Sequence, residues 1–158
     1  MTTDTPLADR PLWSATPTPL TDDLQIDIES TRRLVDHHIR LGVDGLFILG
    51  SCGEGPWLPR EQQRTFVHEV CEYNDGRLTI GVQVTDNSAP RIIENAKIAA
   101  DEGADLGIMA APFKLMGPIA EDMRPLYLDA IEGSPLPMGI YDLGERDATF
   151  VPLDVLTE

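Results

Sequence analysis

The chain has 158 residues, of which 42% are hydrophobic, and 12 basic against 27 acidic residues give a formal net charge of −15. Such an acidic surface repels phosphate backbones, so the composition argues against nucleic-acid binding. No run reaches roughly 18 apolar residues, and residues 1–10 contain no apolar core of a secretion signal, so we expect a cytoplasmic protein with no membrane interaction.

Five short apolar runs bounded by turn residues are predicted as β-strands. They cover residues 12–15, 45–49, 78–84, 106–109 and 138–141. The later four runs are typical of strands that are buried in a parallel sheet. Their starts recur about every 30 residues, which is the size of one strand-and-helix unit.

Amphipathic segments between these strands predict four helices. They cover residues 31–41, 60–73, 89–102 and 121–132, and residues 152–156 resemble the start of a fifth. We expect Gly42 to end the first helix and Ser88 to cap the third. Pro125 must lie in the first turn of the fourth helix or delay its start, because proline lacks the amide that an inner turn uses.

Strands that alternate with helices predict an α/β fold with a parallel sheet and right-handed crossovers. A doubly wound five-stranded sheet is complete at this length. A (β/α)8 barrel needs about 250 residues, so this chain would be a piece of one. Periodicity does not choose between the two. We treat residues 1–158 as one domain, with residues 1–10 as a flexible tail.

In both architectures, ligands bind beyond the carboxyl ends of the strands. The most distinctive segment there is Gly-Ser-Cys-Gly-Glu-Gly-Pro at residues 50–56. Glycines let backbone amides approach an anion, and Ser51 adds a hydroxyl, so a carboxylate or phosphate is one candidate ligand. The alternative is a tight turn that needs glycine for its geometry alone.

Candidate site residues also follow the other strands. They are Thr16 after the first strand; Thr85, Asp86 and Asn87 after the third; Phe113 and Lys114 after the fourth; and Tyr141, Asp142 and Arg146 at the fifth. Tyr141 is either a core aromatic residue or a proton-transfer group. Lys114 is either an exposed loop residue or a nucleophile, and Arg146 is either a solvated charge or a carboxylate clamp.

The cysteines and histidines have structural explanations as well. We expect Cys52 and Cys71 to be reduced, with Cys52 either a nucleophile or a small residue that lines a pocket. The histidines fall on helices with no third ligand at zinc spacing, so we expect no metal site. Of the adjacent pair, His38 should pack inward and His37 should face solvent.

Four segments resemble the dihydrodipicolinate synthase and N-acetylneuraminate lyase family, in order and at similar spacing. They are residues 13–21, similar to its first strand and loop; 42–55, similar to its second strand and pyruvate-binding turn; 102–113, similar to its fourth strand and Pro-aromatic loop; and 136–142, similar to its fifth strand ending in tyrosine. The resemblance implies a (β/α)8 TIM barrel, truncated here to about five βα units as a partial, open barrel. It also implies a lyase or aldolase that acts on pyruvate or a 2-keto-3-deoxy acid through a lysine Schiff base, without a cofactor.

The resemblance implies roles for individual residues. Ser51 and Cys52, with Gly53, stand where the family binds the pyruvate carboxylate and relays a proton. Tyr141 would relay a proton at the reacting carbon, and Arg146 would bind the second substrate's carboxylate in the synthase branch. A protonated imine is an electron sink, and a phenol beside it can donate and accept protons.

Three departures from the family pattern change the expectation. Cys52 stands where the family usually has threonine, and Lys114 stands where it usually has a second aromatic residue. The Schiff-base lysine belongs at the end of a sixth strand and is absent from this chain. We therefore expect a divergent 2-keto-acid aldolase or dehydratase, present here as a fragment. The family also implies a homo-oligomer, a tetramer.

Two other hypotheses stay open. One is a catalytically inactive half-barrel that binds a small carboxylate or associates with another chain, because five strands cannot close a barrel and leave two unpaired edges. The other is a doubly wound receiver or nucleotide-binding domain. That class needs an acidic pocket or a phosphate loop with lysine, and the sequence shows neither convincingly.

Overall fold

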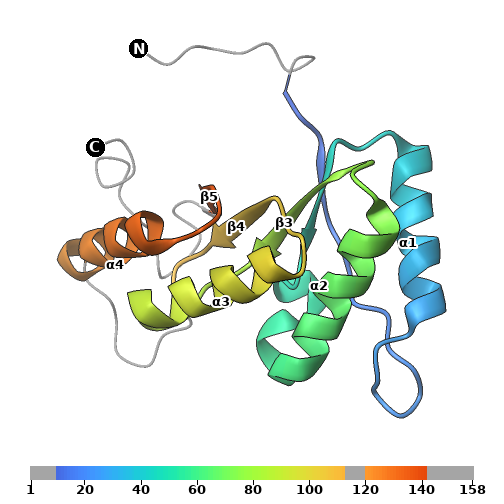
Figure 1. The fold of residues 1–158 in the computed structure, drawn as a ribbon, viewed down its shortest axis with the longest axis horizontal. Coiled ribbons are helices and arrows are strands. Elements are labelled where there is room, and N and C mark those ends of the chain that lie inside the picture. The colour runs from blue at the N-terminus through green and yellow to red at the C-terminus, as the bar shows by residue number, and fades with distance from the viewer. Residues whose placement is uncertain (1–9, 113–119, 142–158) are drawn as a thin grey trace. The chain divides into compact units, whose positions relative to one another are not determined.

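The computed structural model describes residues 10–112 and 120–141. Strands and helices alternate along these ranges, as Figure 1 shows. In chain order they are β1 (Trp13–Ala15), α1 (Ile28–Leu41), β2 (Gly45–Ile48), the 3-10 turns η2 (Ser51–Gly53) and η3 (Gly55–Trp57), α2 (Arg60–Asn74), β3 (Thr79–Gln83), α3 (Ala89–Asp101), β4 (Leu106–Met109), α4 (Ala120–Gly133) and β5 (Met138–Ile140). All five predicted strands are confirmed, with ends that agree within one residue.

The strands form one sheet in the order β1-β2-β3-β4-β5, so each strand neighbours the next one along the chain. The pairs β1–β2, β3–β4 and β4–β5 are parallel. A doubly wound sheet reverses its strand order at a switch point, whereas a (β/α) barrel does not. The observed order therefore supports a partial (β/α) barrel and argues against the doubly wound alternative.

The chain divides into two compact units, Met1–Ile80 and Gly81–Glu158. In the first unit, α1 and α2 pack side by side (Figure 1). Its core joins these helices to the central strand of the unit, and its fully buried side chains are Val35, Leu46, Ile48, Phe66 and Val70. All four residues of β2 are buried, as expected for a strand covered on both faces.

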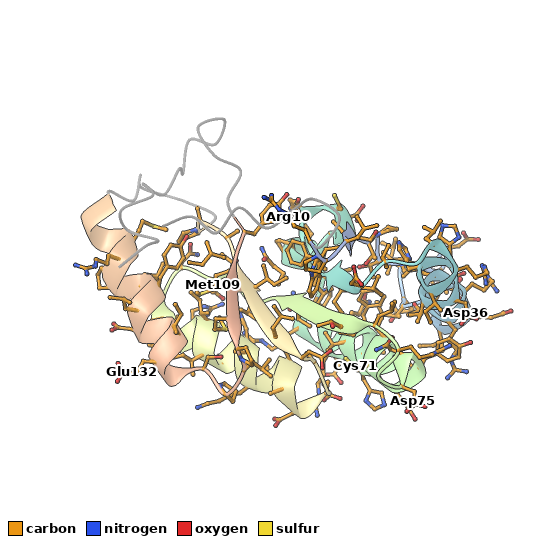
Figure 2. All side chains as sticks on the ribbon, turned by 90° about the horizontal axis from the view of Figure 1, so that it is seen from above. Arg10, Asp36, Cys71, Asp75, Met109 and Glu132 are labelled. Atoms are coloured by element: carbon orange, nitrogen blue, oxygen red, sulfur yellow. The ribbon has the colours of Figure 1, made fainter. Side chains whose placement is uncertain are left out.

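In the second unit, α3 packs against α4, and β4 pairs with β5 (Figure 1). Met109, labelled in Figure 2, ends β4 and is fully buried. The other buried apolar residues of this unit come from its strands and both helices and include Val82, Val84, Ile92, Ala96, Met123 and Ala130. The helix period of these buried positions confirms the amphipathic pattern of α3.

Two helix starts and one expected cap differ from the prediction. α1 begins at Ile28 rather than at residue 31, because the Asp27 side chain accepts a hydrogen bond from the Ser30 amide at 3.0 Å. Ser88 precedes α3 as expected but makes no side-chain capping bond. α4 begins at Ala120, so Pro125 lies inside the helix rather than in its first turn. There a proline removes one backbone hydrogen bond near the helix start, and packing tolerates the loss.

The end of α1 follows the prediction. Gly42 caps the helix with φ of 73°, and its amide donates to the carbonyls of His38 and Ile39. In the described ranges, no helix is both long and apolar enough to cross a membrane.

Candidate active site

The loop after β1 is tied to the turn after β2. The Thr16 amide donates to the Phe47 carbonyl at 3.1 Å, which extends the β1–β2 ladder by one bond. Thr18 follows, and its Oγ1 donates to the Gly53 carbonyl at 2.6 Å. A Cβ added to Gly53 would lie only 3.0 Å from the Thr16 carbonyl oxygen, so glycine permits this close approach. Two predicted site residues, Thr16 and Gly53, are thus brought together.

Thr16 is 1% exposed, and its hydroxyl oxygen has no hydrogen-bond partner among the described residues. A buried polar atom without a partner costs free energy, so such atoms are rare in folded proteins. The sequence alone gave Thr16 no role beyond its place after the first strand. Thr18, which holds the turn directly, was missed, because the two bonded residues are far apart in sequence.

The turn after β2 is wound tightly on itself. Leu49 and Glu54 adopt left-handed φ values of 59° and 54°, which non-glycine residues seldom take. The amides of Gly53 and Gly55 both donate to the Gly50 carbonyl, at 3.0 and 3.2 Å. A Cβ on Gly55 would collide with the backbone of Leu49. The turn therefore needs glycine for its geometry, which was one of the two alternatives for residues 50–56.

The same hydrogen bonds decide which amides remain for an anion. Those of Gly53 and Gly55 are used inside the turn, and the Glu54 amide donates to the Ser51 carbonyl at 3.2 Å. The amides of Ser51 and Cys52 have no backbone acceptor in the described part of the chain. Both residues are exposed, and Cys52 is a free thiol. The geometry is compatible with an anion that contacts these two residues rather than the whole turn.

The second unit holds the other described candidate, Tyr141. Its side chain is 43% exposed, and its amide donates to the Met109 carbonyl at 2.6 Å, just past the end of β5. Thr85 lies just past the end of β3, which pairs with β4. Its hydroxyl accepts a hydrogen bond from the Ala110 amide at 2.7 Å. Thr85 was predicted only as a residue that follows the third strand, with no role.

Asp86, the next residue after Thr85, belongs to a group of charged and polar side chains. Asp86 Oδ1 accepts from Arg91 Nε at 2.8 Å and from the Asn87 amide at 2.7 Å. Burial by itself raises the pKa of Asp86, but the hydrogen bonds from Arg91, Asn87 and Asn95 together outweigh it and lower the pKa. These contacts join the loop after β3 to the first turns of α3.

The remaining predicted residues are not described by the structure. Phe113, Lys114, Asp142 and Arg146 lie outside the described residues. Ser51, Cys52 and Thr16 belong to the first unit and Tyr141 to the second, and each group is described by itself. The shared cavity expected for the glycine turn and the tyrosine therefore stays a prediction.

The histidines are placed as the sequence indicated. His38 is 8% exposed, and its Nδ1 donates to the Leu34 carbonyl at 2.8 Å while Nε2 lies 2.9 Å from Ser14 Oγ. A carbonyl only accepts, so the Nδ1 of His38 carries a proton. Both ring nitrogens of His38 are thus engaged within the protein, which fits a structural role. His37 is exposed.

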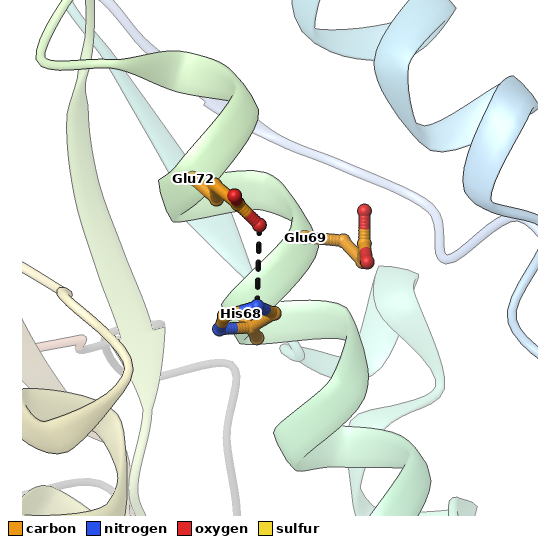
Figure 3. A group of neighbouring side chains, drawn as sticks. All are labelled: His68, Glu69 and Glu72. Atoms are coloured by element: carbon orange, nitrogen blue, oxygen red, sulfur yellow. Dashed lines mark ion pairs between the residues drawn. The ribbon is translucent and has the colours of Figure 1, made fainter.

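One group of potential metal ligands lies on α2, formed by His68, Glu69 and Glu72 (Figure 3). His68 pairs with Glu72 at 3.2 Å, and Glu69 pairs across to Arg32 on α1 at 3.4 Å. These carboxylates have protein partners, and the His68 and Glu72 side chains are more than half exposed. The group is explained as surface ion pairs and carries no metal assignment.

Comparison with known proteins identifies relatives along almost the whole chain. The Dihydrodipicolinate synthetase family matches residues 10–158. A 4-hydroxy-tetrahydrodipicolinate synthase from Thiobacillus denitrificans is 30% identical over 129 residues, which cover 82% of this chain and 43% of that protein. The chain spans about half the length of the curated relatives that it matches.

Solved structures give the same result. The chloride-inhibited dihydrodipicolinate synthase from Acinetobacter baumannii, complexed with pyruvate, is 27% identical with a TM-score of 0.85, over 92% of this chain and 50% of that one. YagE, a prophage protein of the dihydrodipicolinic acid synthase family from E. coli K12, in complex with pyruvate, is 26% identical with a TM-score of 0.78, over 84% of this chain and 44% of that one.

Proposed function

Because the chain belongs to the Dihydrodipicolinate synthetase family, we propose that its complete gene product is a lyase or aldolase acting on pyruvate or a 2-keto-3-deoxy acid through a lysine Schiff base. The observation that carries the proposal is the turn after β2. There the amides of Ser51 and Cys52 have no backbone acceptor within residues 10–112 and 120–141, and the Ser51 hydroxyl lies beside them. Two relatives of known structure are complexed with pyruvate, a small carboxylate of the kind such a turn can bind.

In the proposed reaction, the lysine amine attacks the keto carbonyl and water leaves, which forms the imine. Ser51 and Cys52 hold the carboxylate of the 2-keto acid, and Arg146 holds the carboxylate of the second substrate. The Tyr141 phenol donates a proton to, and accepts one from, the reacting groups beside the imine. The family resemblance implies a lysine at the end of a sixth strand, and we propose that this lysine follows the five strands of this chain.

Imine formation is tested by borohydride trapping. The complete gene product is treated with pyruvate and borohydride, which reduces the imine to a stable secondary amine, and the labelled peptide is identified by mass spectrometry. We expect label on a lysine that follows residue 158. Lys97 and Lys114 are the only lysines of this chain, so Lys97→Arg is the matched control that should not change labelling. Label on Lys114 would overturn the proposed route, and no label on any lysine would refute the imine mechanism.

The role of Tyr141 is tested by Tyr141→Phe, which removes only the phenol hydroxyl. Loss of a general acid–base group typically lowers turnover by about 10²–10⁴-fold. Tyr73→Phe is the matched control, because the Tyr73 hydroxyl donates to Asp36 on α1 at 2.9 Å and belongs to the helix layer. Equal turnover in the two variants would contradict the assignment of Tyr141.

A second candidate function is association with another chain. It is favoured by the sheet, in which β1 pairs only with β2 and β5 only with β4 among the described strands. Ile140 on β5 is 37% exposed, and unpaired strand edges readily pair with further strands. Sedimentation of the 158-residue chain tests this candidate, because further strands in a closed barrel would cover both edges. We expect a homo-oligomer, and a monodisperse monomer would contradict it.

A further inference from the structure

The peptide between Met109 and Ala110, at the carboxyl end of β4, is held from both sides. Its carbonyl oxygen, on Met109, accepts from the Tyr141 amide at 2.6 Å. Its N–H, on Ala110, donates to the Thr85 hydroxyl at 2.7 Å. One rigid peptide plane therefore joins a side chain that follows β3 to the backbone of the proposed proton-transfer residue that follows β5.

Thr85 occupies this position because β3 leaves the ladder here. The Val84 amide still donates to the Ile108 carbonyl at 3.0 Å, which is the last backbone bond of this strand pair. The Val84 carbonyl instead accepts from Asn95 of α3 at 3.2 Å. The Ala110 amide thus finds a side-chain oxygen where a longer strand would supply a backbone carbonyl. Thr85 is half-buried, so water would replace this acceptor only in part.

The sheet register brings the three residues close together at the strand ends. Gln83, Ile108 and Gly139 are neighbours in the β3–β4–β5 ladder. Thr85, Ala110 and Tyr141 each follow two positions later, just past the carboxyl ends of these three strands. The two hydrogen bonds through the Met109–Ala110 peptide are the contacts that join them.

We infer that Thr85 is a positioning residue for Tyr141, acting through the Met109–Ala110 peptide. The inference rests on the proposed role of Tyr141 in proton transfer. Without the Thr85 oxygen, the Ala110 amide loses its acceptor, and the peptide plane is then held on its carbonyl side only. The Met109 carbonyl then fixes the Tyr141 backbone less firmly. A phenol that transfers a proton must be placed closely, and displacements of about 1 Å can cost about a hundredfold in rate.

The test compares three variants of the complete gene product. Thr85→Val keeps the shape and removes the acceptor, and Thr85→Ser keeps the acceptor. Thr79→Val makes the same change at the exposed amino end of the same strand. We expect Thr85→Val to lower kcat for 2-keto acid turnover about tenfold to a hundredfold with KM changed less than about twofold. Thr85→Ser should restore kcat, and Thr79→Val should match the parent protein.

Amide hydrogen exchange provides a second readout that needs no substrate. The Ala110 and Tyr141 amides should exchange faster in Thr85→Val and at the parent rate in Thr85→Ser. Unchanged exchange in Thr85→Val would overturn the inference, even in an active enzyme. Faster exchange with an unchanged kcat would overturn it too, because the bond would then be structural only. If no 2-keto acid is turned over by the parent protein, the proposed function fails, and with it the catalytic meaning of this contact.

Discussion

Among the glycines of the first unit, Gly55 should be the position where substitution by alanine destabilises the protein most. A Cβ at position 55 would collide with the carbonyl group of Leu49 and would lie 2.8 Å from its Cα. These atoms are backbone, so no side-chain rotation relieves the contact. Leu49 already has a left-handed φ of 59°, which leaves it little freedom to move away.

The magnitude follows from what the turn must give up. Inserting a group into a packed site typically costs about 1–3 kcal/mol. Opening the turn also weakens the bond from the Gly55 amide to the Gly50 carbonyl, 3.2 Å long, and a typical hydrogen bond contributes about 0.5–1.5 kcal/mol. We therefore expect Gly55→Ala to lower the free energy of unfolding by roughly 2–4 kcal/mol.

The assay is urea unfolding of the complete gene product, followed by circular dichroism, with Gly42→Ala as the control. Gly42 has a left-handed φ of 73°, but an added Cβ there meets nothing within 4 Å. Its substitution should cost only the backbone strain of about 1–2 kcal/mol. If Gly55→Ala is no less stable than Gly42→Ala, the steric argument is refuted. The same two variants should also differ in pyruvate binding, because only position 55 lies in the proposed carboxylate turn.

Three further predictions concern single side chains. Tyr73→Phe should lower the free energy of unfolding by about 1.5–3 kcal/mol in urea titrations, because it keeps the ring but removes the 2.9 Å hydrogen bond to the Asp36 carboxylate. An unchanged free energy of unfolding would show that this hydrogen bond does not stabilise the fold. The lowered pKa of Asp86 means that its stabilising effect is present above the ordinary value of 3.8 and is lost as the pH falls through the lowered pKa. Asp86→Asn should thus be less stable than the parent protein at neutral pH and close to it in acid, and a pH-independent difference in the urea midpoint would contradict the pairing with Arg91. Cys52→Thr should raise turnover of 2-keto acids, because a hydroxyl forms stronger hydrogen bonds in a proton relay than a thiol does. Steady-state kinetics that show a lower kcat would refute this.

The strands were predictable because their signal is local. The residues of β2 are buried on both faces, and a short apolar run between turn residues records that burial directly. Helix boundaries were less predictable. The start of α1 depends on the hydrogen bond from the Ser30 amide to the Asp27 side chain. Several polar residues near Asp27 could equally have capped the helix, so the sequence did not single out Asp27. The inclusion of Pro125 within α4 reflects packing of the helix, which no local rule contains.

The candidate site divides in the same way. Ser51, Gly53 and Tyr141 were predicted from the sequence because they lie where strands end, and ligands in parallel α/β folds bind there. The sequence by itself therefore determined the five strands, the position of the glycine-rich turn and the residue types that follow the strand ends. Only the tertiary structure showed that Thr18 holds the turn, at 2.6 Å from Gly53, and that Thr85 supports the Ala110 amide. These partners are 35 and 25 residues apart, and only parallel strand pairing, a long-range interaction, brings such residues within hydrogen-bonding distance.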